Sequence, residues 1–124
     1  MKLRISGNSI RIRLQQQELA YLIKFGLVQD SVTFSLDPSR SLSYALVAAD
    51  HVNEVEAQYE EGQILISVPK QVLTEIAETD RVGISYQKRL GDDTLAILIE
   101  KDYKCLTPRA EDEDAFPHPE QKNC

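Results

Sequence analysis

The start of the chain alternates between apolar and polar residues in two short runs, at residues 2–6 and 9–14. A period of two predicts half-buried β-strands, and the intervening Gly7-Asn8 pair predicts a two-residue hairpin turn. Similar runs predict further strands at residues 31–36, 42–48, 55–60, 63–68, 82–89 and 94–101. Apolar residues at helical spacing predict helices at residues 15–26 and 69–79.

The predicted elements fall into two similar halves. A shift of 54 positions places Ile10, Ile12, Leu14, Leu19 and Leu22 on Ile64, Ile66, Val68, Leu73 and Ile76. After the first helix the shift falls to 50, where residues 30–34 (DSVTF) align with residues 80–84 (DRVGI). Such periodicity predicts two ββαββ repeats, residues 1–53 and 54–104, within one domain of residues 1–104. Residues 105–124 are expected to form an extended, acidic, proline-containing tail.

These repeats predict a β-rich α+β fold, either a pseudo-symmetric barrel or a sandwich, with two short helices. The sequence leaves open whether the repeats exchange hairpins or pack without exchange. No apolar run approaches the ~20 residues of a transmembrane helix, and the first residues lack the apolar core of a signal peptide. We therefore expect a cytoplasmic protein without a membrane partner.

The first hairpin carries a concentration of positive charge. In the register that its turn fixes, Lys2 faces Arg13 and Arg4 faces Arg11, on the side opposite the apolar residues. Like charges that face each other in a sheet are destabilising, whereas the planar guanidinium of arginine suits phosphate. These four residues are therefore the predicted site for an anion or a nucleic acid.

The charge of the whole chain changes this picture. Its 124 residues carry a net charge of −6, which argues against indiscriminate binding to nucleic acids. Residues 1–53 carry six Lys/Arg and four Asp/Glu, whereas residues 54–104 carry six and eleven. The tail adds an acidic run with an adjacent aromatic residue: Glu111, Asp112, Glu113, Asp114 and Phe116. We expect the hairpin to contact either a protein partner or this tail, with Phe116 as an anchor in a groove.

The segment GNSIRIRL, followed by a helix and then QDSVTF, resembles the swapped-hairpin modules of AbrB-like transition-state regulators and matching antitoxins. Residues that match their pattern are Gly7, Asn8, Ser9 and Asp30, and in the second repeat Val68, Pro69 and Asp80. Gln15 replaces the usual proline, and neither repeat has the glycine before the aspartate. The resemblance spans roughly residues 2–100 and implies interleaved hairpins in one barrel, with DNA bound by basic residues near the first hairpin.

The end of the chain shows a second resemblance. The segments EKDYKCL, PR and EDEDAFP and the final cysteine resemble a family of small bacterial proteins with no assigned function. This resemblance covers Lys101 to Cys124 and implies no activity.

Chemistry that would identify an enzyme is sparse. Cys105, His118 and Cys124 are candidate metal ligands, but the spacing C-x12-H-x5-C lacks the close ligand pairs of zinc sites. There is no P-loop and no G-x-G-x-x-G segment, so no cofactor is predicted. We expect an uncharacterised, non-enzymatic interaction protein that uses the basic hairpin and the acidic tail. The alternatives are an AbrB-like DNA-binding regulator or antitoxin, and a metal-binding protein or enzyme with a hidden site.

Overall fold

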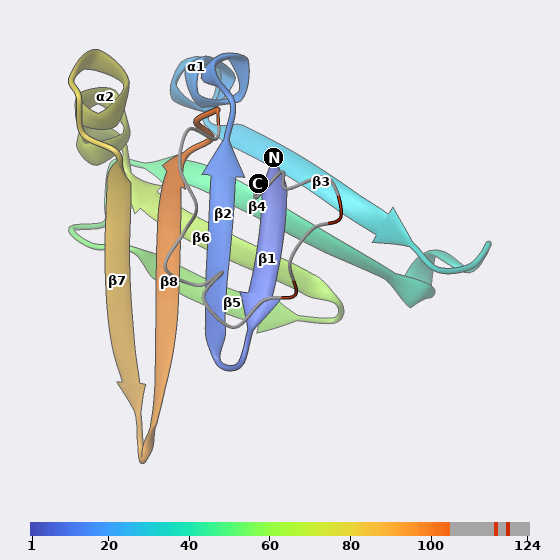
Figure 1. Cartoon of the computed structure of the whole chain (residues 1–124). Coiled ribbons are helices and arrows are strands. Elements are labelled where there is room, and N and C mark those ends of the chain that lie inside the picture. The colour runs from blue at the N-terminus through green and yellow to red at the C-terminus, as the bar shows by residue number, and fades with distance from the viewer. Residues whose placement is uncertain (105–115, 117–118, 120–124) are drawn as a thin grey trace.

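A computed structural model describes residues 1–104, 116 and 119 of the chain. Two hairpins and one helix alternate twice along these residues (Figure 1). The first half contains β1 (Lys2–Ser6), β2 (Ser9–Leu14), α1 (Gln16–Phe25), β3 (Leu27–Thr33), a short 3-10 helix η1 (Pro38–Arg40) and β4 (Ser41–Ala49). The second half contains β5 (Glu56–Glu60), β6 (Gln63–Pro69), α2 (Lys70–Glu78), β7 (Gly83–Leu90) and β8 (Asp93–Lys101). The fold is α+β and rich in strands, as the alternation predicted.

Local sequence explains where α1 begins and ends. The backbone N–H of Gln15 donates to Oε1 of Glu18 at 2.9 Å, which satisfies a free donor at the helix start. Gly26 follows the last turn with a φ of 86°, a left-handed conformation that glycine adopts without a Cβ penalty. Gly26 therefore stops the helix and turns the chain directly into β3.

The two halves exchange hairpins. Sheet A has the strand order β1-β2-β8-β7, and sheet B has the order β3-β4-β6-β5. Each sheet therefore joins one hairpin from each repeat, through the central parallel pairs β2–β8 and β4–β6. If β1-β2 of sheet A is matched with β5-β6 of sheet B, then β8-β7 is matched with β4-β3, and the two sheets have the same strand order. The layout is therefore pseudo-symmetric.

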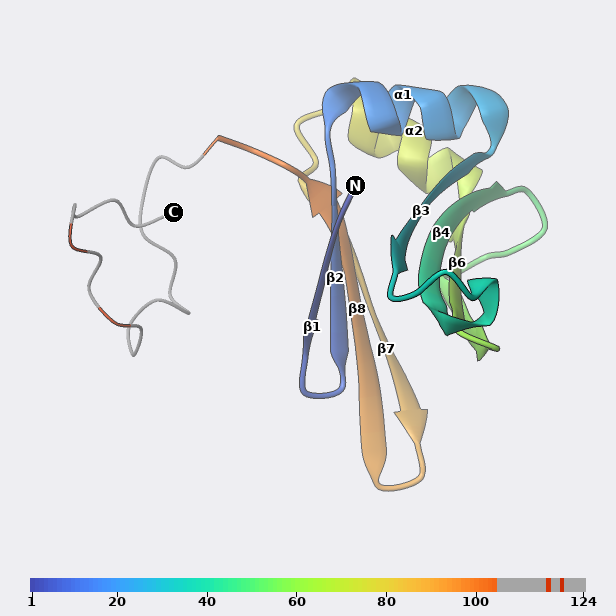
Figure 2. The ribbon, with the colours of Figure 1, turned by 90° about the vertical axis from the view of Figure 1, so that its right-hand side faces the viewer.

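A shared core holds the sheets and helices together. Helices α1 and α2 lie side by side at one end of the sheets, and the hairpin turns of sheet A point away from them (Figure 2). Ile12 and Ile99 of sheet A, and Leu46 and Ile66 of sheet B, are all at most 1% exposed. Leu22 and Leu73 add the buried stripes of the two helices. Ile12 and Ile66 occupy equivalent places, as the shift of 54 positions predicted.

Three expectations need correction. The described strands form two separate sheets and no closed barrel, so the barrel alternative was wrong. The third strand covers Leu27–Thr33 and not residues 31–36, because Gly26 reverses the chain immediately after α1. The strand registers make Leu27 equivalent to Gly83, a shift of 56 positions, so the alignment of DSVTF with DRVGI was also wrong. Asp30 consequently lies inside β3, opposite Tyr44.

Candidate functional site

The turn Gly7-Asn8 fixes the first hairpin in the predicted register. Gly7 has a φ of 55°, and Ser9 Oγ donates to Ser6 O at 2.6 Å across the turn. Asn8 also ties the turn to the neighbouring strand β8, because its Nδ2 donates to Thr94 O at 3.0 Å. The hairpin is therefore held at its tip as well as along its strands.

The register places Lys2 opposite Arg13 and Arg4 opposite Arg11, as predicted. All four side chains project from the outer face of sheet A, since their neighbours Leu3 and Ile12 lie on the side of the core. We call these four residues, Lys2, Arg4, Arg11 and Arg13, the basic face.

Strand β8 supplies carboxylates to the basic face. Glu100 lies opposite Arg13 in the parallel pair β2–β8. Its Oε1 is 2.9 Å from Nε of Arg13 and 3.6 Å from Nε of Arg11. Asp102 follows β8, and its Oδ2 is 2.9 Å from Nζ of Lys2. Glu100 and Asp102 therefore offset part of the repulsion among the four cations.

The four side chains of the basic face differ in how far they are exposed to solvent. The side chain of Lys2 is 69% exposed and Arg4 is also exposed. Arg13 and its partner Glu100 are only 18% and 16% exposed, and Arg11 is half-buried beside them. The two cations of the edge strand β1 are thus more exposed than the two arginines of β2, which lie beside Glu100.

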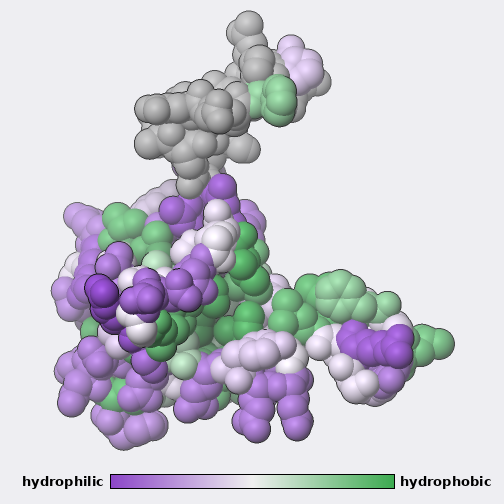
Figure 3. Space-filling model, turned by 90° about the horizontal axis from the view of Figure 1, so that it is seen from below, coloured by the Kyte–Doolittle hydropathy of each residue, from purple (hydrophilic) through white to green (hydrophobic). Residues whose placement is uncertain are grey.

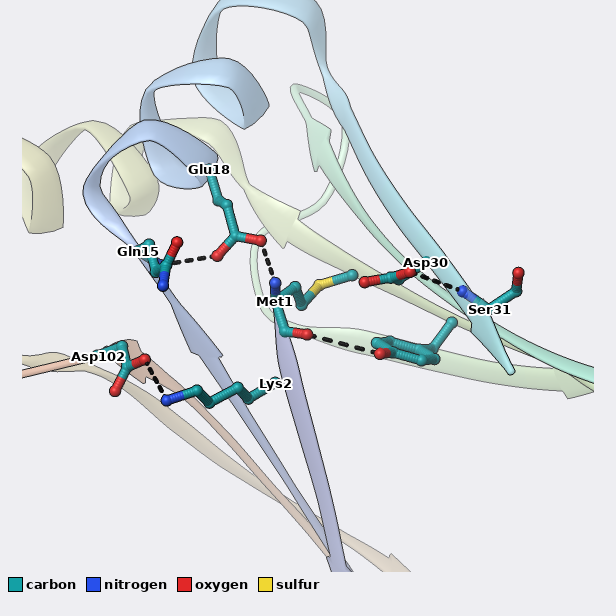
Figure 4. Close-up of polar contacts among 8 residues, drawn as sticks. Met1, Lys2, Gln15, Glu18, Asp30, Ser31 and Asp102 are labelled. Carbon is teal, nitrogen blue, oxygen red and sulfur yellow. Dashed lines mark hydrogen bonds and ion pairs between the residues drawn. The ribbon is translucent and has the colours of Figure 1, made fainter. Parts of the chain in front are cut away.

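Contacts at the chain start fix the end of the basic face nearest the helices (Figure 4). The ammonium group of Met1 contacts the carboxylate of Glu18, and Tyr44 donates its hydroxyl to Met1 O at 3.5 Å. Burial raises the pKa of Tyr44, and the negative charges of Asp30 and Glu18 raise it further. Tyr44 is therefore a neutral donor at this position near neutral pH.

A cavity adjoins the Lys2–Asp102 pair. It has a volume of about 410 Å³ and lies where β8 ends beside α1 and α2. Its lining combines apolar and polar residues: Leu14, Gln15, Gln16, Leu19, Ala20, Ala77, Lys101, Asp102 and Tyr103. Lys101 is held there because its Nζ donates to Thr79 O at 2.9 Å. The volume is within the usual range of ligand sites, and Leu14, Leu19, Ala20 and Ala77 make part of the lining apolar.

Comparison with known proteins gives a family but no activity. A family model, described as a family of unknown function (DUF7009), matches residues 1–120. The chain belongs to the DUF7009 family. No curated protein and no solved structure matches it. Membership in a family without assigned function agrees with the second resemblance in general terms, whereas its C-terminal pattern and the AbrB-like resemblance are not confirmed.

Other predicted residues of the DUF7009 chain can be placed only in part. Phe116 is described and is 97% exposed. The acidic run Glu111, Asp112, Glu113 and Asp114, and the candidate ligands Cys105, His118 and Cys124, lie outside the described residues. Within the described residues, no group of three or more His, Cys, Asp or Glu side chains is arranged to hold a metal ion. No described helix is long and apolar enough to cross a membrane.

Sequence reasoning did not identify the carboxylates of the DUF7009 basic face. It expected a protein partner or the acidic tail to contact the hairpin and did not single out Glu100 or Asp102. Glu100 is 87 positions from Arg13 in sequence, and the parallel β2–β8 pair is what brings them together. A usable signal was the unusual charge at the end of the apolar run TLAILIEK, residues 94–101.

Proposed function

We propose that this DUF7009 protein is a non-enzymatic binding protein whose basic face takes an acidic protein segment. The observation that carries the proposal is the gathering of four cations on one face of a chain of net charge −6. Glu100 and Asp102 contact three of them, Lys2, Arg11 and Arg13, and Lys2 and Arg4 are exposed. Opposite charge steers and orients a partner.

The geometry favours a peptide over a larger polyanion. Lys2 and Arg4 are the more exposed cations of the face, and Asp102, the partner of Lys2, lines a cavity whose apolar part suits an apolar side chain. A segment with several acids and one aromatic residue combines both features. The chain itself contains such a segment at residues 111–116, so the occupant is either a partner's segment or the chain's own tail.

The test is binding of a fluorescent peptide with the sequence AEDEDAFP, residues 110–117, to the full chain, followed by anisotropy. The double variant K2Q/R4Q is expected to weaken binding by roughly tenfold, because two solvent-facing charges are lost. The matched control K88Q/R89Q removes two exposed cations from β7 and is expected to leave binding within about twofold.

The tail is examined in the same assay. Conversion of the four acids at residues 111–114 to their amides is expected to strengthen peptide binding if the tail occupies the basic face, and to leave it unchanged if the occupant is a partner. Absence of peptide binding by both the wild type and this variant would overturn the proposal.

Duplex DNA is the second candidate, because the exchanged hairpins are what the AbrB-like resemblance implies and a two-stranded ribbon fits a major groove. Four phosphate contacts predict a slope of about −3 to −4 in a plot of log K against log salt. Binding of a short duplex with this slope, without binding of the peptide, would establish the DNA alternative instead.

A further inference from the structure

Strand β3 is an edge of sheet B, and it is less protected by charge than the other three sheet edges. Charged side chains on an edge strand hinder pairing with another chain. The edge strands β1, β5 and β7 each carry two or more charges, at Lys2, Arg4, Glu56, Glu60, Lys88 and Arg89. Strand β3 has seven residues and a single charge, Asp30. Its edge therefore presents a backbone with little electrostatic protection.

The backbone groups of this edge follow from the β3–β4 ladder. Gly26 O accepts from Ala48 N at 3.0 Å, and Phe34 N donates to Arg40 O at 3.3 Å. In an antiparallel pair, every second residue bonds to the partner strand. The residues between these bonded positions direct their N–H and C=O groups away from β4: Leu27, Gln29, Ser31 and Thr33. Asp30 Oδ1 accepts from Ser31 N at 3.0 Å, which covers one of these donors.

Exposed apolar side chains gather at both ends of β3. Before and at its start, the tilted rings of Tyr21 and Phe25 of α1 lie with their centroids 4.6 Å apart, and Leu27 is also exposed. At its end, Val32 is exposed, Phe34 is 71% exposed and Leu36 is fully exposed. Figure 3 shows the β3–β4 connection as a projection at the right of the molecule, with apolar surface along one side. The edge is thus flanked by two apolar clusters.

We propose that β3 pairs antiparallel with β3 of a second copy of this chain, about a two-fold axis at Ser31. In an antiparallel pair the start of each strand lies beside the end of the other. The aromatic rings of Tyr21 and Phe25 at the end of α1 in one copy then lie near Phe34 and Leu36 of the other. A two-fold interface requires this kind of self-complementary surface, and it covers apolar side chains of both clusters at once.

The register of the proposed pairing between the two β3 strands follows from charge and hydrogen bonding. An axis at Asp30 places two carboxylates opposite each other, which is unfavourable. An axis at Ser31 makes Ser31 a hydrogen-bonded pair with its equivalent, because its backbone groups point outward. It also places Phe34 opposite Val28 of the second copy, and Leu36 near the end of that copy's α1. The Asp30–Ser31 contact gives way to a hydrogen bond between the copies.

The surface is large enough for a stable dimer. A covered Phe or Tyr buries about 150–250 Å², so Tyr21, Phe25 and Phe34 at 54–71% exposure offer roughly 370 Å². Val32 and Leu36 raise this to roughly 600 Å² per chain, at the lower end of the ~600–1,000 Å² that each partner buries in a standard interface. The basic face lies on the other sheet, so peptide binding and dimer formation are tested independently.

The first test is the mass of the full chain in solution, by sedimentation across roughly 1–100 µM, a range suited to interfaces of this size. The expected result is a dimer of twice the 14.0 kDa chain mass. Phe34→Ser should raise the dissociation constant by tenfold or more. The matched control Tyr59→Ser removes an aromatic side chain of the same exposure, 70%, from β5 and should leave the dimer intact. A monomeric wild type, or equal effects of the two variants, overturns the proposal.

The second test locates the axis. Hydrogen-bonded antiparallel pairs have Cα atoms about 5.5 Å apart, which is within the range of a disulfide. In a background of C105S and C124S, oxidised Ser31→Cys should form a covalent dimer, whereas Ser85→Cys on edge strand β7 should stay monomeric. Circular dichroism confirms that both variants are folded. Equal cross-linking of the two variants, or none at residue 31, contradicts the proposed pairing.

Discussion

Replacement of Glu100 by glutamine removes a carboxylate that contacts both Arg11 and Arg13. The hydrogen bond to Arg13, at 2.9 Å, joins side chains that are 16–18% exposed, so solvent screens it only in part. Hydrogen bonds to charged groups contribute about 1.5–3 kcal/mol, and exposed ion pairs less than about 1 kcal/mol. We expect the free energy of unfolding to fall by about 1.5 kcal/mol, and Tm by roughly 5–9 °C for a chain of this size.

Urea unfolding of Glu100→Gln, Arg13→Gln and the double variant measures the effect as a double-mutant cycle. The expected coupling energy is about 1 kcal/mol. Glu75→Gln is the matched control, because Glu75 pairs with Arg81 at 3.1 Å while 54% exposed, and a loss of only a few tenths of a kcal/mol is expected there. Additive effects of the two changes, or equal losses at Glu100 and Glu75, would refute the proposed role of Glu100 in holding the basic face.

Three further outcomes are expected. Gly83→Ala should lower the unfolding free energy by more than about 2 kcal/mol, because a Cβ there would lie 2.2 Å from Ile99 O; thermal melting that matches wild type would contradict this. Ile66→Ala should cost about 2–5 kcal/mol in urea unfolding, since Ile66 is fully buried. The raised pKa of Tyr44 means that wild-type stability falls as pH rises above about 10, and Tyr44→Phe should lessen that fall in alkaline melts. An unchanged alkaline profile would show that Tyr44 ionisation does not contribute.

The sequence predicted the helices and strands better than it predicted which strands lie side by side. Alternation shows which side chains of a strand face the core, so Ile12 and Ile66 could be assigned before the structure. Alternation does not say which strand lies alongside, and the parallel partner of each central strand comes from the other repeat. Strand β3 was misplaced because β-branched residues at 31–34 favoured a strand there, while Gly26 was treated only as the end of a helix.

The same limitation explains which contacts of the candidate site could be predicted from the sequence. The hairpin turn fixed Lys2 opposite Arg13 by local rules alone. The carboxylate of Glu100 could not be assigned to these cations, because hairpin exchange determines that contact. Long-range parallel pairing is the information that a local pattern lacks.

Because each sheet joins one hairpin from each repeat, the outer face of sheet A can be compared position by position with the outer face of sheet B. The equivalents of the basic face in the second repeat are Glu56, Gln58, Leu65 and Ser67, and the equivalent of Glu100 is Val47. The buried positions of the two halves have nearly the same chemistry, as Ile12 and Ile66 illustrate, because both must fill one core. The second face has no such cluster of cations at these positions, so the fold does not require one. Four neighbouring cations are costly for stability, and their presence on one face, but not at the equivalent positions of the other, supports the proposed role in binding.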